Sequence, residues 1–178
     1  MGSPKFHAPA KLFYGALFTD AATLSAARDE LAALHGPIDY ESEVFDFDFT
    51  GYYQKEMAGP IKRIFYTFER PFDPVELVSV KIASNDIEKK YSRADGSRTI
   101  NLDPGYATVA KIVLASTKDN IHRIYIRDGI YEEITLFYKD GSFRPFQWTF
   151  PDYRERYVPF FNRVRREMKL KASDKERN

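Results

Sequence analysis

Two Asp-Gly pairs, at residues 128–129 and 140–141, constrain the second half of the chain more than any other feature. Each pair is flanked on both sides by runs rich in β-branched and aromatic residues. Asp-Gly readily adopts the positive φ angles that a tight two-residue hairpin turn requires. The sequence therefore predicts a three-stranded antiparallel meander. Its last strand is expected at a sheet edge, because Pro145 cannot donate a backbone hydrogen bond to a neighbouring strand.

The first half alternates strand-like and helix-like segments, which the spacing of apolar residues distinguishes. The last of its helices could also be a short strand, because Val78, Val80 and Ile82 alternate. The order β-α-β-β-α-β is that of a ferredoxin-like unit. The predicted segments are a strand at 11–18, a helix ending before Gly36-Pro37, a strand at 38–49, a strand at 61–69 after a loop at 50–60, a helix from Pro74 to Tyr91 and a strand at 98–102.

Residues 100–106 read INLDPGY and predict the start of a third helix. Asp103 is a suitable N-cap and Pro104 is favoured at the first helical position. Tyr106 and Val113 then fall on one helical stripe. If the Asp103 carboxylate turned away from the helix amides, an anion or a substrate could bind there, with Lys111 nearby.

The C-terminal part predicts a final helix, in which Pro159 is expected to kink or split the chain because its ring crowds the preceding turn. The expected fold class is therefore α+β: a mostly antiparallel sheet with a ferredoxin-like βαββαβ first part, extended by a helix, the three-stranded meander and the C-terminal helix. The 178 residues, 43% of them hydrophobic, suffice for one core. We expect a single domain over 1–178, with flexible tails at 1–9 and 171–178.

Charge and cysteine content exclude several classes of protein. The 27 Lys and Arg residues nearly balance the 26 Asp and Glu residues, so no overall field attracts nucleic acid or anionic lipid. The chain contains no Cys, which excludes disulfides, thiolate metal sites and a thiol nucleophile and favours a cytoplasmic protein. No segment has the pattern of a signal peptide or a membrane span, so no membrane partner is expected.

The hairpin register predicts one polar cluster. If residues 128–129 form the first turn, counting back across the strands puts His122 opposite Thr135 and diagonal to Glu133. Counting through the second turn puts Trp148 opposite Glu133. An imidazole oriented by a carboxylate is the arrangement that general acid–base catalysis requires. His122 and Glu133 are therefore the candidate catalytic residues, although a structural histidine bonded to Glu133 explains the same pattern.

Further binding residues and a metal site follow from the same reading. Asp46 and Asp48 alternate onto one strand face and could share a divalent cation with a third oxygen ligand such as Asp103, but a solvated strand face is the simpler explanation. No zinc-type ligand set, phosphate loop or nucleophile elbow occurs, so no other cofactor is predicted. The candidate ligand-binding residues are Asn101, Asp103, Lys111, Thr135 and Trp148.

Three long stretches of the chain resemble a known family. They are GPIDYESEVFDFDFTGYY at 36–53, INLDPGYATVAKIVLASTKDNIHRIYIRDGIYEEITLFY at 100–138 and QWTFPDY at 147–153. In this order they resemble the bacterial family known as domain of unknown function 4416 (DUF4416), and the resemblance covers nearly the whole chain. It implies a small cytoplasmic bacterial protein and carries no assigned reaction or catalytic residue.

We therefore predict a protein that binds, or acts on, a small anionic, nucleotide-like ligand, with His122 as acid or base and Glu133 orienting it. The alternative is a non-catalytic module that binds RNA or another protein through the aromatic run at 61–69 or through a basic C-terminal edge. The balanced net charge makes nucleic acid the less favoured partner, and the sequence does not determine the oligomeric state. The basic edge consists of Arg163, Arg165, Arg166, Lys169 and Lys171.

Overall fold

The computed structural model describes residues 2–7, 10–49, 56–57 and 59–177, with side chains up to Ser173. Within these ranges an antiparallel sheet of nine strands has the order β2-β4-β1-β5-β6-β8-β7, with β3 paired to β4 and β9 paired to β8. The α+β class is therefore confirmed. The elements are β1 (Ala10–Phe18), α1 (Ala21–His35), β2 (Ile38–Glu41), β3 (Phe45–Asp46), β4 (Lys62–Phe72), the 3₁₀ turn η2 (Pro74–Glu76), α2 (Leu77–Lys90), β5 (Ile100–Ala107), β6 (Lys111–Ser116), β7 (Ile124–Arg127), β8 (Ile130–Lys139), β9 (Ser142–Pro145), α3 (Pro151–Glu155) and α4 (Val158–Arg177).

Most of the first half folds as its apolar pattern predicts, but the strand predicted at 38–49 forms only as the short strands β2 and β3, with residues 42–44 and 47–49 outside them. β1 is buried at all nine residues, as expected for a strand covered on both faces. α1 begins after Asp20, whose carboxylate accepts a hydrogen bond from the Thr23 N–H at 2.7 Å. Asp73 similarly accepts from the Val75 N–H in η2, and the chain continues into α2 rather than into the alternative strand.

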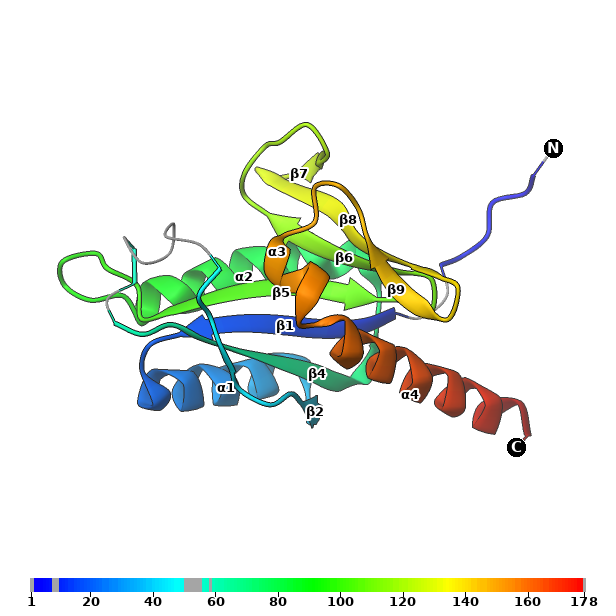
Figure 1. Ribbon diagram of the computed structural model, residues 1–178, viewed down its shortest axis with the longest axis horizontal. Helices are drawn as coiled ribbons and strands as arrows, with labels where there is room; N and C mark the ends of the chain where they lie inside the picture. The colour runs from blue at the N-terminus through cyan, green and yellow to red at the C-terminus, as the bar shows by residue number, and fades with distance from the viewer. Residues whose placement is uncertain (1, 8–9, 50–55, 58, 178) are drawn as a thin grey trace.

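Helices cover both faces of the central strands (Figure 1). On one face, Tyr14 of β1 belongs to a core cluster that includes Leu31 of α1 and Val80 of α2. On the other face, Phe13 packs in a cluster with residues of α3 and α4, and its ring centroid lies 5.0 Å from that of Phe161. Alternate residues of one strand thus belong to two different cores, which explains its continuous hydrophobicity.

The predicted helix after Pro104 is wrong. Residues 100–107 form β5 and residues 111–116 form β6, so Asp103 lies inside a strand and caps no helix. β1 offers a complete edge to this segment, and every residue of β5 has a partner on it. Pairing along eight residues overrides the local Asp-Pro signal, since strand preference depends more on cross-strand packing than on a single turn motif.

The meander is confirmed as β7, β8 and β9. Asp128 and Asp140 have φ angles of 53° and 50°, and the glycines that follow them are also positive, as two-residue hairpin turns require. The register of β8 with β9 is the predicted one, from Lys139 opposite Ser142 to Leu136 opposite Pro145. The register of β7 with β8 was predicted correctly only beside the turn, where Arg127 faces Ile130. A register shift follows, β7 begins only at Ile124 and β9 ends at Pro145. The predicted cross-strand partners of Thr135 and Glu133 are therefore wrong, because the partner residues lie outside the strands.

The C-terminal helix is split, as Pro159 predicts. α3 ends at Glu155, and α4 starts at Val158 with the proline in its first turn. α4 continues to Arg177, through residues predicted as a tail. Residues 1, 8–9 and 178 of the predicted tails, and 50–55 and 58 of the predicted loop, lie outside the described residues. None of the helices in the described ranges is long and apolar enough to cross a membrane.

Candidate functional site

The sheet opens between two neighbouring strands. β5 pairs with β1 along its whole length, but with β6 only from Gly105 to Ala107. β6 then follows β8 as far as Ser116. Beyond Gly105 the two strands therefore diverge, and we call the gap between residues 100–104 and the end of β6 the wedge.

Pro104 explains why the pairing stops there. Leu102 directs its N–H and C=O away from β1, because they bond to Glu88 and to Lys81. Backbone groups alternate along a strand, so Pro104, two residues further on, faces the same edge. Its missing N–H is thus on the side of β6 and cannot continue the ladder. The same residue that suggested a helix start ends a strand pair instead.

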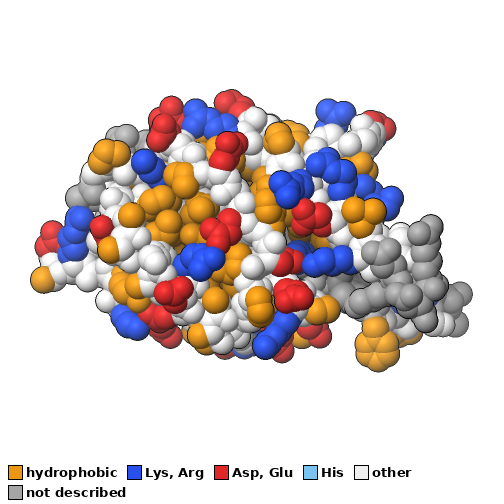
Figure 2. Space-filling model, turned by 90° about the horizontal axis from the view of Figure 1, so that it is seen from below, with side chains coloured by type: hydrophobic (Ala, Val, Ile, Leu, Met, Phe, Trp, Pro, Cys, Tyr) orange, Lys and Arg blue, Asp and Glu red, His pale blue; other side chains and the backbone are white. Residues whose placement is uncertain are grey.

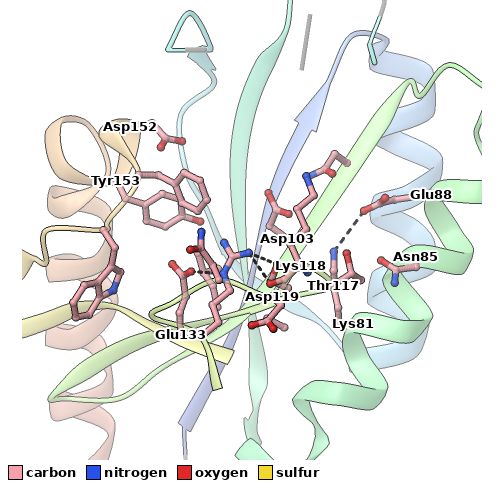
Figure 3. A pocket seen from close by; sticks show the side chains of 18 of the residues that line it. Lys81, Asn85, Glu88, Asp103, Thr117, Lys118, Asp119, Glu133, Asp152 and Tyr153 are labelled. Atoms are coloured by element: carbon pink, nitrogen blue, oxygen red, sulfur yellow. Dashed lines mark hydrogen bonds and ion pairs between the residues drawn. The ribbon is translucent and has the colours of Figure 1, made fainter. Parts of the chain in front are cut away.

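A cavity of about 600 Å³ occupies the wedge. Figure 3 shows Lys81, Asn85 and Glu88 of α2 on one side and Asp152 and Tyr153 of α3 on the other, with Glu133 below Tyr153 and Asp103 in the middle. The volume is in the range of small-molecule sites, which is roughly 300–1,000 Å³. The other lining residues are Phe47, Glu56, Arg63, Arg98, Asn101, Leu114–Asn120, His122, Arg123, Trp148 and Phe150.

The predicted contact between His122 and Glu133 is confirmed, by a route other than strand register. His122 lies in the loop between β6 and β7, and its Nε2 is 3.0 Å from Glu133 Oε2. The Arg123 Nε–H donates to the same oxygen at 2.8 Å, and the Thr135 hydroxyl donates to Oε1 at 3.2 Å. With the carboxylate held by three groups, the position of the imidazole is fixed from one side.

Aromatic stacking fixes His122 from its other side. Its ring lies 5.5 Å from the Trp148 ring at an interplanar angle of 12°, and Phe146 stacks on Trp148 at 4.7 Å. The indole N–H donates to the Ile134 carbonyl at 3.1 Å, on the stretch of β8 between its pairings with β7 and β9. Both faces of Trp148 are occupied, so it orients the histidine and presents only part of its surface to the cavity.

The α2 side of the cavity carries a buried ion network. Glu88 accepts from the Leu102 N–H at 2.7 Å and lies 3.2 Å from Arg98 and 3.9 Å from Lys81. Burial raises the pKa of Glu88 to about 7, although the neighbouring Lys81 opposes this shift. Arg98 also donates to Asn101 Oδ1 at 3.0 Å. A carboxyl that titrates near neutral pH beside a cavity is typical of functional sites.

A second buried ion network forms the floor of the cavity. Arg63 of β4 lies 3.3 Å from Asp103 and 3.6 Å from Asp152. Burial raises the pKa of Asp152, and Arg63 opposes this shift. Tyr153, which lines the same part of the cavity, is buried, and its pKa is raised well above the usual value by desolvation.

The structure brings together most, but not all, of the predicted site residues. Asn101, Asp103 and Trp148 line the cavity, and Thr135 positions Glu133 from behind. Lys111 does not line it: it starts β6 opposite Phe137, at the other end of the strand.

The predicted cation site is not assembled. Asp48 pairs with Arg156 at 3.0 Å, and the guanidinium also donates to the backbone carbonyl of Asp46. The proposed third ligand, Asp103, is held by Arg63 instead. Within the described part of the chain, no group of three His, Asp or Glu residues is arranged to hold a metal ion.

Sequence reasoning missed the charged residues that complete the cavity. Lys81 and Glu88 lie seven residues apart on the buried stripe of α2, and Arg63 directly precedes the buried apolar run Ile64–Tyr66 of β4. Charged residues at positions that periodicity assigns to the core need internal partners. A charged residue at a position assigned to the core was therefore the feature of the sequence that could have identified these residues.

Comparison with known families establishes which family the chain belongs to, but it assigns no function to the cavity. The profile of the family described as domain of unknown function (DUF4416) matches residues 8–168. The chain belongs to this family. Neither a curated protein nor a solved structure matches the chain. DUF4416 membership therefore supplies no reaction, and the chemistry must be inferred from the cavity.

Proposed function

We propose that this DUF4416 protein binds a small anionic, nucleotide-like ligand in the wedge cavity and that His122 exchanges a proton with it. The observation that carries the proposal is the fixed imidazole at the cavity surface, bonded to Glu133 and stacked on Trp148. When Glu133 is ionised it accepts from Nε2–H, which leaves Nδ1 as the atom for proton exchange with the ligand. Glu133 and Trp148 are then positioning residues.

The cavity walls support a polar ligand of nucleotide size. Cationic and acidic side chains are interspersed along the lining, and many of them are already paired, as Arg98 is with Glu56 and Arg123 with Glu133. Such a lining favours a ligand with one anionic group and several hydrogen-bonding groups over a polyanion. Lys81, whose amine donates to the Leu102 carbonyl at 2.9 Å and lies 3.9 Å from Glu88, is the cation we assign to that group.

Burial of the aromatic strand argues against the alternative, an RNA-binding module. Stacking on bases requires exposed rings on the sheet surface. Phe65, Tyr66 and Phe68 of β4 are each no more than 1% exposed, because helices cover both faces of the strand. This run is therefore part of the core and is not available to a nucleic acid.

The basic C-terminal edge is also engaged within the protein. Arg163 lies over the Tyr40 ring, Arg165 donates to the Val109 carbonyl, and Lys171 pairs with Asp39. On the face in Figure 2, Lys and Arg side chains are interspersed with Asp and Glu. These contacts favour a small ligand over a phosphate backbone, which is bound by a continuous basic surface.

The same proposal includes a fold assignment and a compartment. The connection β-α-β-β-α-β and the strand order β2-β4-β1-β5 support a ferredoxin-like first part. The lack of Cys supports a cytoplasmic location.

A ligand panel tests the function. Nucleotides, phosphosugars and inorganic phosphate are added to the wild-type protein, and its melting temperature is measured. A ligand at 100 times its Kd stabilises the native state by about 2.7 kcal/mol, which is roughly 5–10 °C for a chain of this size. His122→Ala should abolish turnover of a hit, whereas His7→Ala, in the exposed N-terminal segment, should not. The proposal fails if no compound stabilises the wild type, or if His122→Ala changes neither stabilisation nor turnover.

A further inference from the structure

Arg63, Asp103, Asp152 and Tyr153 form one group on the floor of the cavity, which we call the Arg63 centre. Its ion pairs measure 3.3 and 3.6 Å. Charge-assisted N–H···O bonds in well-formed pairs are shorter, about 2.7–2.9 Å. The guanidinium is thus held near both carboxylates without closing tightly on either.

The position of Arg63 requires a glycine on β1 and places a charged group among aromatic rings. Its guanidinium reaches across β1 at Gly15, where an added Cβ would lie 2.6 Å from Nη1. Gly15 pairs with Asp103 on one side and Phe65 on the other, so only a residue without a side chain leaves the path open. Four aromatic rings surround the guanidinium, with centroids 5.4–5.9 Å away, and these belong to Phe47, Phe65, Tyr153 and Tyr157. A charge placed in such apolar surroundings is uncommon unless all its hydrogen bonds are made.

Two polar atoms of this centre have no partner in the described part of the protein. They are Arg63 Nε and the Tyr153 hydroxyl, both in side chains that are at least nine-tenths buried. Asp103 is more open, with 24% of its side chain exposed beside the cavity. Buried polar groups are rarely left unpaired, so unpaired groups that adjoin a cavity mark a place where a ligand group belongs. In Figure 3 the Tyr153 side chain and Asp103 both lie toward the middle of the cavity.

The charges of the Arg63 centre determine which kind of ligand group can bind there. A phosphate or carboxylate would face the two acids, Asp103 and Asp152, and a metal ion or an amine would face the Arg63 guanidinium. A hydroxyl satisfies both, because it donates to a carboxylate and accepts from a guanidinium or a phenol. Two adjacent hydroxyls would engage the centre on both sides. Carboxylates bind the hydroxyls of ribose in this manner in dinucleotide sites.

We propose that the Arg63 centre binds adjacent hydroxyl groups of a sugar, such as a ribose, on the ligand. This inference rests on the proposed function, since it assigns the sugar end of the ligand that the cavity receives. The hydroxyls donate to Asp103 and accept from Tyr153. The rest of the ligand extends across the cavity toward His122 and Lys81, which line the same space.

Calorimetric titration of the wild-type protein with two matched pairs of compounds tests the inference. The pairs are adenosine monophosphate against its 2′,3′-dideoxy analogue, and ribose 5-phosphate against 1,4-butanediol monophosphate, which has no adjacent hydroxyls. We expect the member with adjacent hydroxyls to bind at least tenfold more tightly in at least one pair. Asp103→Asn should remove that preference, whereas Asp29→Asn, at an exposed position on α1 that does not line the cavity, should keep it.

Equal affinities within both pairs, or a preference that survives in Asp103→Asn, overturn the inference. If neither member of either pair binds, the sugar assignment is likewise rejected. The proposed function is judged separately, because it fails only if the wider panel contains no stabilising compound. The wild-type comparison needs no variant, so it stands even if Asp103→Asn does not fold.

Discussion

Glu88 offers the most direct test of the electrostatics of the cavity. Glu88 belongs to α2, which forms one wall of the wedge cavity. Its carboxylate accepts a hydrogen bond from the Leu102 N–H, which does not pair with β6. Burial raises its pKa to about 7, more than Lys81 lowers it. The substitution Glu88→Gln keeps the acceptor for Leu102 and removes the titration.

The sign and the size of the effect follow from this pKa. The native state binds the Glu88 proton more tightly than the unfolded chain, where the ordinary value is 4.5. The carboxyl therefore stabilises the fold fully below pH 4.5, and that stability is lost as pH rises to about 7. The difference between the two pKa values corresponds to about 3 kcal/mol.

The assay is urea unfolding of the wild type and Glu88→Gln between pH 4 and pH 8. The free energy of unfolding of Glu88→Gln minus that of the wild type should rise by about 3 kcal/mol from pH 4.5 to pH 7.5 and then level off. Glu43→Gln, at an exposed position, serves as the control and should give a much flatter difference. A difference that is flat or falls with pH would refute the reasoning, because the cations Lys81 and Arg98 would then outweigh burial.

Three further substitutions test other parts of the site by the urea midpoint. Gly15→Ala should cost about 1–3 kcal/mol, because the methyl displaces the Arg63 guanidinium. Tyr153→Phe should stabilise the protein by about 1 kcal/mol, since it removes a buried hydroxyl that has no partner among the described residues; destabilisation would show that the hydroxyl is satisfied. Glu133→Gln should lower the free energy of unfolding by about 3 kcal/mol, because it leaves buried cationic groups uncompensated. The control Glu132→Gln should lower it by less than about 1 kcal/mol, because burial raises the pKa of Glu132. Similar costs for the two glutamates would contradict that assignment.

Local chemistry was sufficient to predict much of the fold. The Asp-Gly pairs fix two turns, Gly36-Pro37 ends the first helix, and Pro159 splits the last one. Each of these signals acts within a few residues, where backbone geometry decides the outcome. Asp103 and Pro104 failed as a signal because a distant strand, β1, supplied a partner that the local sequence does not reveal.

The site was predicted in part, and partly for the wrong reason. His122 does contact Glu133, but β7 begins only at Ile124, so His122 reaches this acid from the preceding loop and not from the strand. The pairing of Arg63 with Asp152 could not be predicted, because β4 and α3 come together only through tertiary packing. Lys111 was assigned to a helix start that does not form.

Amide chemical-shift mapping with the tightest-binding compound of the panel tests the central claim most directly, because it locates the ligand without a variant. The account predicts the largest changes at 101–103, 116–123, 133 and 148–153, which surround the wedge. Changes concentrated on the outer face of α4 or on α1, with the wedge unaffected, would contradict it.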